Sequence, residues 1–459
     1  MHPPVNPRSG SPEDLLSRLV AETASSAIPE AARAAAALQV FDAVGVTLAA
    51  AGEPAGLAIS TVVKGQGGVP ESRMLGTAIR TSSVQAAWAN GSLAHLLDFD
   101  DAGFSHPTAC IYPAALALAE RADLDGRTFL DAMVLGYEVF ERLSASGRAD
   151  EPRVRQRGYH PTSIYGAVAA AAAAGRVLGL DARQLVVAFG IAASDASGLT
   201  QQFGTWAKGL NAGNAARSGV QAALLAEAGF WGDEAGLSGT YGLYAAVHGE
   251  GRYDFAGVER GLGSRWSIVD PGLTIKLYPA CGINRSPVDA VLEVLDELGE
   301  RRGQIERIVV HIHPHVLGTV RFQAPTDGFR GKFSLDYTVA AAALDGRVDL
   351  DTYSDERANR PEFREMLRRV ELRPHPEWDI ARYREVPIEV HLADGSMVER
   401  SVRRPRGTRE NPLTMDDITG KYLACARRVL PADRAEASMT AWLSLADAPS
   451  VASLCESVA

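Results

Sequence analysis

Residues 161–180 read PTSIYGAVAAAAAAGRVLGL, an almost uninterrupted run of small apolar side chains. No charge interrupts the run before Arg176, and its alanine content predicts a helix. Because side chains this small let neighbouring helices approach closely, the stretch indicates a dense all-α bundle. The uncharged run is shorter than the roughly 18 residues that a membrane span needs, so we expect a core helix.

The helical pattern extends in both directions, from residue 12 to about residue 270. Pro29 and Glu30 precede AARAAAALQVFDAVGVTLAAAG (31–52), which predicts a helix with proline in its first turn and an end at Gly52. The same composition predicts further helices within residues 82–99, 107–122, 126–146 and 215–230.

The pattern changes after Pro271. IERIVVHIHPHV (305–316) alternates and is β-branched, which predicts a half-buried strand. Two alternating runs flank Asp394-Gly395 within residues 386–402, and this pattern is typical of a β-hairpin. Helical segments lie between them at 333–346 and 360–370, and helix returns at 415–430.

These patterns predict a mainly α protein with four segments. We expect a disordered arm at 1–11, a helical domain at 12–270, a smaller α+β domain at 271–409, and C-terminal helices at 410–459 that rejoin the helical domain.

Composition narrows the classes of protein. The 459 residues are 46% hydrophobic and 22% charged, as in an ordinary globular protein. The formal net charge of −10 disfavours nucleic acid and anionic membranes as partners, so an anionic substrate requires a locally basic pocket. Four cysteines lie scattered without metal-ligand spacing, and no signal-peptide pattern opens the sequence. We therefore expect a reduced, cytoplasmic protein.

Two polar clusters interrupt the apolar helices of the first domain. The first, HLLDFDD (95–101), is followed by His106. Asp98 and His106 either face a pocket or belong to an exposed helix end and acidic loop; a metal site is a third option. In the second, Thr162 is a plausible N-cap, which puts His160 just outside a helix N-terminus. There the helix dipole lowers a histidine pKa and favours a general base, the alternative being a packing histidine.

Cations and a thiol occur further along the chain. Lys208 lies among Gly, Ala and Trp, either as a solvated loop charge or as a cation placed to meet an anion. Lys276, Cys281 and Arg285 lie together near the predicted domain boundary, where substrate clefts often form. Tyr337 starts a helix of the smaller domain, as a core aromatic or a pocket donor. The sequence has no P-loop, dinucleotide fingerprint, HExxH or nucleophile elbow.

Taken in order, these stretches resemble the MmgE/PrpD family, which contains 2-methylcitrate dehydratases, cis-aconitate decarboxylases and an iminodisuccinate epimerase. The similarity runs from about residue 13 to the C-terminal helices and includes residues 86–120, 158–181 and 276–290. The resemblance implies a homodimer, a helical domain built from both chain ends, and catalysis without a metal or organic cofactor on a small carboxylate substrate. It also puts the following residues on family active-site positions: Asp98, His106, His160, Lys208, Lys276 and Tyr337.

The sequence departs from the family at three positions. Ala102 stands where dehydratases and decarboxylases commonly carry a hydroxyl residue, Cys281 where the decarboxylases have a catalytic histidine, and Arg285 where many members have another. Three hypotheses follow. The first is a lyase that dehydrates or decarboxylates a di- or tricarboxylate, with acid–base work by His106 and His160 and with Asp98 orienting a histidine. The second is an epimerase that uses Cys281 as one proton donor. The third is a non-catalytic binding protein on the same fold.

Overall fold

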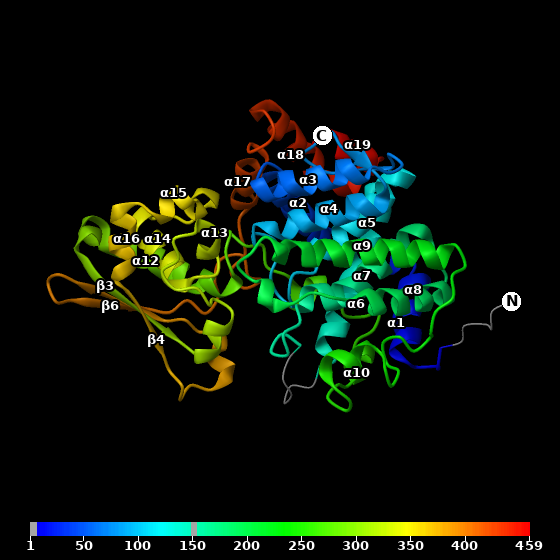
Figure 1. Cartoon of the computed structure of the whole chain (residues 1–459), viewed down its shortest axis with the longest axis horizontal. Helices are drawn as coiled ribbons and strands as arrows, with labels where there is room; N and C mark the ends of the chain where they lie inside the picture. The colour runs from blue at the N-terminus through cyan, green and yellow to red at the C-terminus, as the bar shows by residue number, and fades with distance from the viewer. Residues whose placement is uncertain (1–6, 148–153) are drawn as a thin grey trace. The chain divides into compact units, whose positions relative to one another are not determined.

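The chain folds into two compact units, one of which is made from both ends of the sequence (Figure 1). The computed structural model describes residues 7–147 and 154–459. Of the arm predicted at 1–11, residues 1–6 lie outside the described residues, and Ser11 already caps the first helix. Unit 1 consists of Met1–Gln201, Trp206–Leu273 and Met415–Ala459, and unit 2 of Gln202–Thr205 and Thr274–Thr414.

The regular structure of unit 1 is helical in its described residues, apart from a short hairpin of β1 (Ser72–Arg73) and β2 (Arg80–Thr81). The prediction of a mainly α chain is confirmed. Its helices are α1 (Pro12–Glu22), α2 (Glu30–Ala51), α3 (Pro54–Gln66), α4 (Ser83–Leu96), α5 (Thr108–Ala122), α6 (Gly126–Ala145), α7 (Pro161–Leu178), α8 (Ala182–Asp195), α9 (Ala207–Glu227), α10 (Leu243–His248), α11 (Ala256–Glu259), α17 (Met415–Ala426), α18 (Ala432–Leu443) and α19 (Val451–Ser457).

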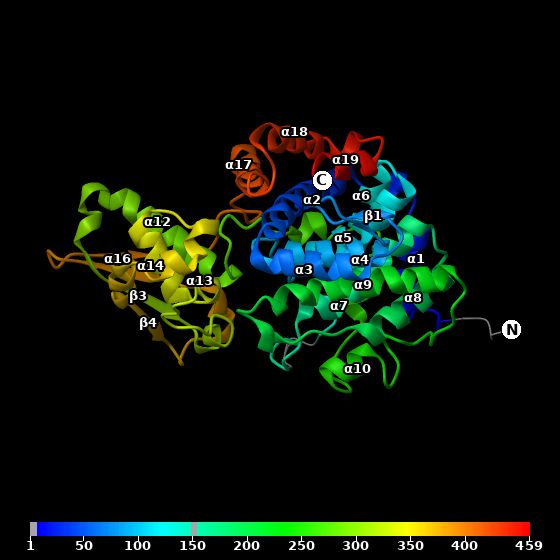
Figure 2. The ribbon, with the colours of Figure 1, turned by 45° about the horizontal axis from the view of Figure 1, so that its top comes forward.

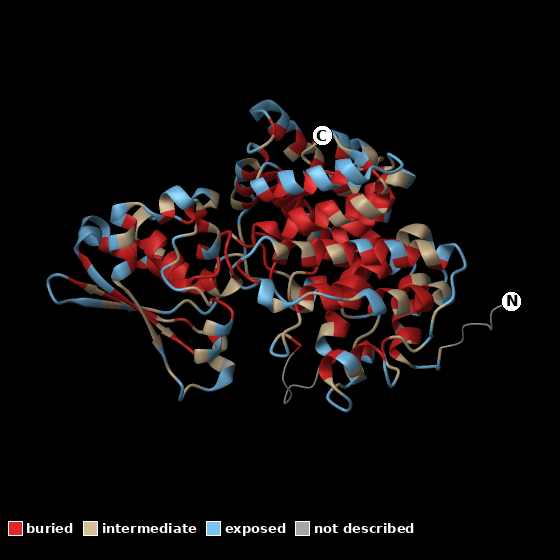
Figure 3. Cartoon of the chain, in the orientation of Figure 1, coloured by how far each residue is buried: buried red, intermediate tan, exposed pale blue. Residues whose placement is uncertain are grey.

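The alanine-rich α7 lies in the core of unit 1, and every residue from 167 to 175 is buried (Figure 3). Figures 1 and 2 show α9 beside α7 and α4. Glycines make this approach possible. A Cβ added at Gly219 would lie 2.4 Å from the Cβ of Ala170 on α7, and one added at Gly213 would lie 2.4 Å from the carbonyl oxygen of Trp88 on α4. Small residues therefore hold α9 at backbone contact with both neighbours.

The helix α2 is long and apolar enough to span a membrane by composition alone, but 78% of its most apolar window is buried inside the protein. Two ion pairs link it to other helices of unit 1. Arg33 Nε donates to Asp131 Oδ1 at 2.7 Å, and Lys421 Nζ of α17 lies 2.7 Å from Asp42 Oδ1. The C-terminal segment therefore packs on α2, and α2 is a core helix of unit 1.

Unit 2 has a four-stranded sheet in the order β4-β3-β5-β6, in which β3 pairs parallel with β4 and antiparallel with β5. The hairpin predicted around Asp394 is confirmed as β5 and β6. The strand β4 was not predicted. The strands and helices are β3 (Ile305–Ile312), β4 (Val370–Pro374), β5 (Ile388–Leu392), β6 (Met397–Arg400), α12 (Arg285–Leu298), α13 (Gly328–Gly331), α14 (Leu335–Asp345), α15 (Asp355–Ala358) and α16 (Pro361–Arg368).

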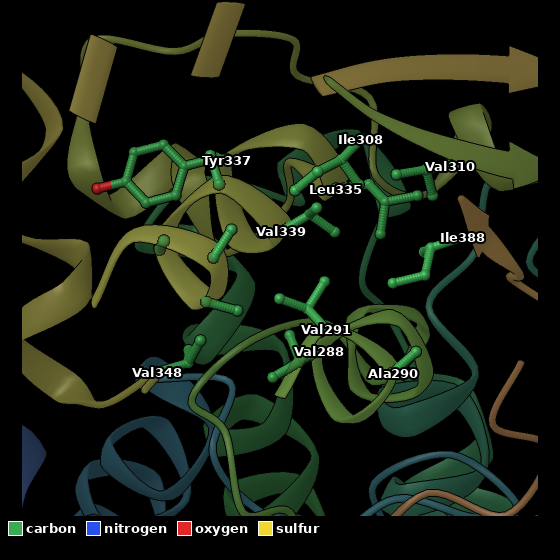
Figure 4. Close-up of a cluster of buried hydrophobic side chains, with 14 of the residues drawn as sticks. Val288, Ala290, Val291, Ile308, Val310, Leu335, Tyr337, Val339, Val348 and Ile388 are labelled. Carbon is green, nitrogen blue, oxygen red and sulfur yellow. The ribbon is translucent and has the colours of Figure 1, made fainter. Parts of the chain in front are cut away.

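Helices α12 and α14 pack on the sheet through a core of branched aliphatic side chains (Figure 4). Val291 of α12 and Val339 of α14 point toward Ile308 and Val310 of β3 in this core. Ile308 and Val310 are alternate residues of β3, so their side chains leave the strand on the same face, and that face packs against the helices.

Candidate active site

The acidic segment after α4 is buried, with Asp98 and Asp101 each 2% exposed and Asp100 fully buried. The alternative of an exposed acidic loop is therefore wrong. Asp98 has φ +52°, a left-handed conformation that aspartate tolerates better than most residues, and it ends the helix. Buried carboxylates require hydrogen bonds or cations, so the partners of these three aspartates define the site.

A chain of hydrogen bonds joins Asp100, His95, Lys208 and Asp98. His95 Nδ1 lies 2.8 Å from Asp100 Oδ2, and Lys208 Nζ lies 2.8 Å from His95 Nε2. Because an ammonium group only donates, His95 Nε2 accepts and the ring carries its proton on Nδ1. Lys208 Nζ also donates to Asp98 Oδ1 at 3.2 Å.

Lys208 is thus 4% exposed and meets an internal anion, which favours the second of its two alternatives, a cation placed to meet an anion, over a solvated loop charge. Asp100 is the carboxylate that bonds the ring of His95, whereas Asp98 pairs with Lys208. This differs from the sequence prediction because α9, which begins at Ala207, brings Lys208 between Asp98 and the ring of His95.

His106 presents the more accessible imidazole, with 18% of its side chain exposed. Its Nδ1 lies 2.6 Å from the carbonyl oxygen of Asp101 and 3.4 Å from Asp100 Oδ2. A carbonyl oxygen only accepts, so the ring donates from Nδ1 and the neutral form keeps its lone pair on Nε2. His106 is therefore built to act as a base through Nε2.

His160 has the opposite tautomer. Its Nδ1 lies 3.1 Å from Asn211 Nδ2, an amide nitrogen that only donates, so the neutral ring carries its proton on Nε2. His160 is itself the N-cap of α7, with Pro161 in the first turn, which corrects the prediction of Thr162 as the cap. Its ring makes no capping hydrogen bond because Asn211 holds it. The neutral ring of His160 therefore presents a proton at Nε2, which differs from the general-base role that the sequence predicted for this residue.

The three imidazoles lie together, with the centroid of His95 4.7 Å from that of His106 and 5.4 Å from that of His160. Burial, aided by the charge of Lys208, lowers the pKa of His95 to about 4, although Asp100 opposes the shift. Burial also holds the pKa of His160 well below its ordinary value, with further lowering by His95 and Lys208. Burial raises the pKa of Asp100, but His95 and His106 outweigh it and keep this carboxyl ionised.

We expect acid to destabilise the protein through these histidines. The folded pKa of His95 lies near 4 and its ordinary value is 6.5, so below pH 6.5 the unfolded chain binds a proton that the folded chain does not. Stability should fall as pH drops from 6.5 toward 4, with His95 alone contributing about 2 kcal/mol between pH 7 and pH 5. Urea denaturation at the two pH values measures the loss, and a His95→Gln variant should show a smaller one. An unchanged pH slope in the variant would contradict the assignment.

Four side chains of this site could also hold a metal ion, since one donor atom from each lies within 4.8 Å of the others: His95, Asp98, Asp100 and His106. Lys208 already bonds His95 Nε2 and Asp98 Oδ1, so a metal ion would have to compete with an ammonium group for those two donors. The contact with Lys208 therefore disfavours a metal ion bound at these residues.

The structure brings four predicted site residues together in unit 1 (Asp98, His106, His160 and Lys208), and the other four lie in unit 2. There Lys276 is fully buried, and Cys281 is 8% exposed and donates its backbone N–H to the Lys332 carbonyl oxygen. The Tyr337 ring belongs to the core of unit 2, and its hydroxyl donates to the Thr352 carbonyl oxygen at 2.7 Å (Figure 4). This geometry favours the core alternative for Tyr337.

Three residues of the site had no predicted role: His95, Asp100 and Asn211. Asn211 lies three residues after Lys208 on α9, so helical spacing places both on one face and could have suggested it. His95 and Asp100 lie within the quoted acidic stretch, but no periodicity identifies which aspartate meets the ring.

The fold and the site define a mainly α protein that gathers a buried lysine, two buried histidines and a partly exposed third histidine among buried aspartates. The chain belongs to the MmgE/PrpD family: the family's N-terminal domain matches residues 14–256 and its C-terminal domain residues 278–446.

Curated relatives agree with this assignment. The chain is 30% identical to the cis-aconitate decarboxylase of Homo sapiens over 378 residues, which is 78% of this chain and 76% of the relative. It is 28% identical to the cis-aconitate decarboxylase of Aspergillus terreus over 392 residues, which is 79% of this chain and 78% of the relative. It is 26% identical to the mitochondrial 2-methylcitrate dehydratase of Yarrowia lipolytica over 375 residues, which is 74% of this chain and 69% of the relative.

Proposed function

We propose that the protein is a lyase of the MmgE/PrpD type, which dehydrates or decarboxylates a small di- or tricarboxylate through an enolate-like carbanion. One observation carries the proposal: the neutral tautomers have a lone pair on His106 Nε2 and a proton on His160 Nε2, and both rings lie beside His95, which bonds the buried ammonium group of Lys208. The names of the relatives, decarboxylases and a dehydratase, support the same reaction class.

The acid–base roles follow from the tautomers. In a dehydration, His106 removes the proton next to a substrate carboxylate while His160 Nε2–H donates a hydrogen bond to the leaving hydroxyl, which departs as water with the proton that His106 took up. In a decarboxylation, carbon dioxide leaves first, and a proton from a histidine is then transferred to the carbanion that remains. Burial keeps the pKa of His160 well below its ordinary value, so it acts from the neutral ring, as a donor of Nε2–H. Positioned groups of this kind contribute typically on the order of 10²–10⁴-fold each.

Lys208 stabilises the negative charge that develops on the substrate carboxylate. Its ammonium group is held by Asp98 and by His95 Nε2, and two of its three protons are thereby committed. A buried cation that is already held in place needs little reorganisation when an oxyanion forms beside it. Asp100 keeps His95 in the tautomer that accepts from Lys208.

In unit 2 the proposal assigns substrate binding to Lys276 and Arg285 on the strength of the family resemblance. Tyr337 contributes its ring to the core. The homodimer and the cytoplasmic location remain predictions of the sequence.

Proton NMR of the purified protein in D₂O tests the proposal, with citrate, 2-methylcitrate, cis-aconitate, malate and iminodisuccinate as substrates. We expect an alkene or a decarboxylated product, and the same rate after treatment with EDTA. Deuterium incorporation at a Cα–H position without loss of water or carbon dioxide would instead indicate an epimerase. No change in any substrate would contradict catalysis on this class and favour a binding protein.

The second candidate is an epimerase, and Cys281 is the observation that favours it. By the family resemblance, the thiol stands at the position of a decarboxylase histidine, and a second proton donor is what an epimerase requires. For the lyase we expect a Cys281→Ser variant to keep turnover within about threefold of the parent, since a hydroxyl conserves the volume. Loss of all turnover with an unchanged melting temperature would support the epimerase instead.

A further inference from the structure

Arg285, the first residue of α12, is a buried cation without an anionic partner. The residue is 8% exposed, and Nε donates to the Gly282 carbonyl oxygen at 3.3 Å. Its Nη1 has no hydrogen-bond partner, and no carboxylate of the described residues lies within 4.0 Å of the guanidinium. Burying a guanidinium without an anion lowers the stability of the folded protein, because the charge loses its hydration and gains no ion pair in return.

The other deeply buried guanidiniums of the described chain are paired. Arg33 Nε contacts Asp131 Oδ1 at 2.7 Å, and Arg142 Nη2 contacts Glu138 Oε2 at 3.0 Å. Both side chains are 2% exposed or less. Arg285, which is 8% exposed, is nearly as buried as these paired arginines and yet lacks the pair.

The neighbouring charges cannot supply the missing anion. Asp289 lies one turn along α12, but its Oδ1 accepts from the Tyr278 hydroxyl at 2.6 Å and its Oδ2 from the Arg406 backbone N–H at 2.7 Å. Burial lowers the pKa of Arg285 to about 10, with Arg384 adding repulsion and Asp289 and Cys281 opposing it. The guanidinium therefore stays charged at neutral pH and remains short of negative charge.

We infer that Arg285 anchors an anion subsite in unit 2, in which the guanidinium binds a carboxylate group of the substrate. The planar fork of arginine matches the two oxygens of a carboxylate, and such charge-assisted bonds are strong where water is excluded. The inference rests on the proposed function for the identity of the anion and deepens it by assigning one carboxylate to one residue.

The test compares ligand-dependent stability in matched variants. Thermal unfolding of the full chain is followed during titration with succinate and citrate, and with sodium sulfate as a second source of anions. For the parent we expect a rise of about a few degrees in Tm at roughly 100-fold excess over Kd. An Arg285→Met variant should lose this rise and should melt above the parent without ligand, because the unpaired charge is gone. The control variant Arg33→Met should melt below the parent, because it leaves the buried Asp131 carboxylate without its cation.

An Arg285→Lys variant retains the positive charge but loses the planar guanidinium that can bind both carboxylate oxygens. Its Tm should still rise with added carboxylate, but with about tenfold weaker affinity. Overturning results are a carboxylate response in Arg285→Met equal to that of the parent, or no response of the parent to any of the three anions. A response to sulfate that is lost with the carboxylate response supports the same subsite.

The outcome separates this inference from the proposed function. Turnover by Arg285→Met with an unchanged KM would overturn the subsite and leave the lyase intact. Anion binding that depends on Arg285, together with no turnover of any carboxylate, would keep the subsite and refute the lyase.

Discussion

A Lys208→Met variant is expected to lose both turnover and stability. Removing the ammonium group deletes a preorganised donor to the developing oxyanion, which typically lowers kcat by about 10²–10³-fold. It also leaves the buried Asp98 carboxylate and His95 Nε2 without their cation. Breaking one side of a buried ion pair costs about 3–5 kcal/mol, which urea denaturation of the variant would measure.

The double variant Lys208→Met/Asp98→Asn separates the two losses. Neutralising Asp98 removes the stranded charge, so we expect most of the lost stability to return while turnover stays at the level of Lys208→Met. Recovery of turnover in the double variant would mean that the lysine only balances charge. Full stability in the single variant would mean that the pair is not buried in solution.

Substituting His106 and His160 separately by asparagine should divide the reaction into its two proton transfers. With a hydroxy-acid substrate, His106→Asn removes the base, so deuterium exchange next to the carboxylate and product formation should fall together by about 10²–10⁴-fold. His160→Asn removes the donor to the leaving hydroxyl, so exchange should continue while product falls. Proton NMR in D₂O reports both quantities in one experiment.

The opposite pattern would exchange the two roles and contradict the tautomers assigned from Asp101 and Asn211. Full turnover by either variant would remove that histidine from the mechanism. The matched control is His248→Asn, which alters another buried histidine of unit 1, one that contacts Tyr165 and has no place in the proposed chemistry. We expect its turnover to match that of the parent.

Several parts of the fold could be predicted from local pattern alone. Alanine and glycine content indicated the dense packing of α7, and the alternation around Asp394 and Gly395 indicated the hairpin of β5 and β6. The strand β4 was missed because VELRP directly follows the amphipathic α16, and the helical pattern of that segment was extended through Val370.

The sequence by itself indicated a mainly α chain with an inserted α+β segment, and it singled out Asp98, His106, His160 and Lys208 as candidate site residues. Only the tertiary structure decided which of these groups meet. His95 and Lys208 are 113 residues apart, and they bond because Gly209 and Gly213 let α9 lie against α4. In a buried site, proton positions and pKa values depend on distances of a few tenths of an ångström between such partners, and no local pattern of residues contains those distances.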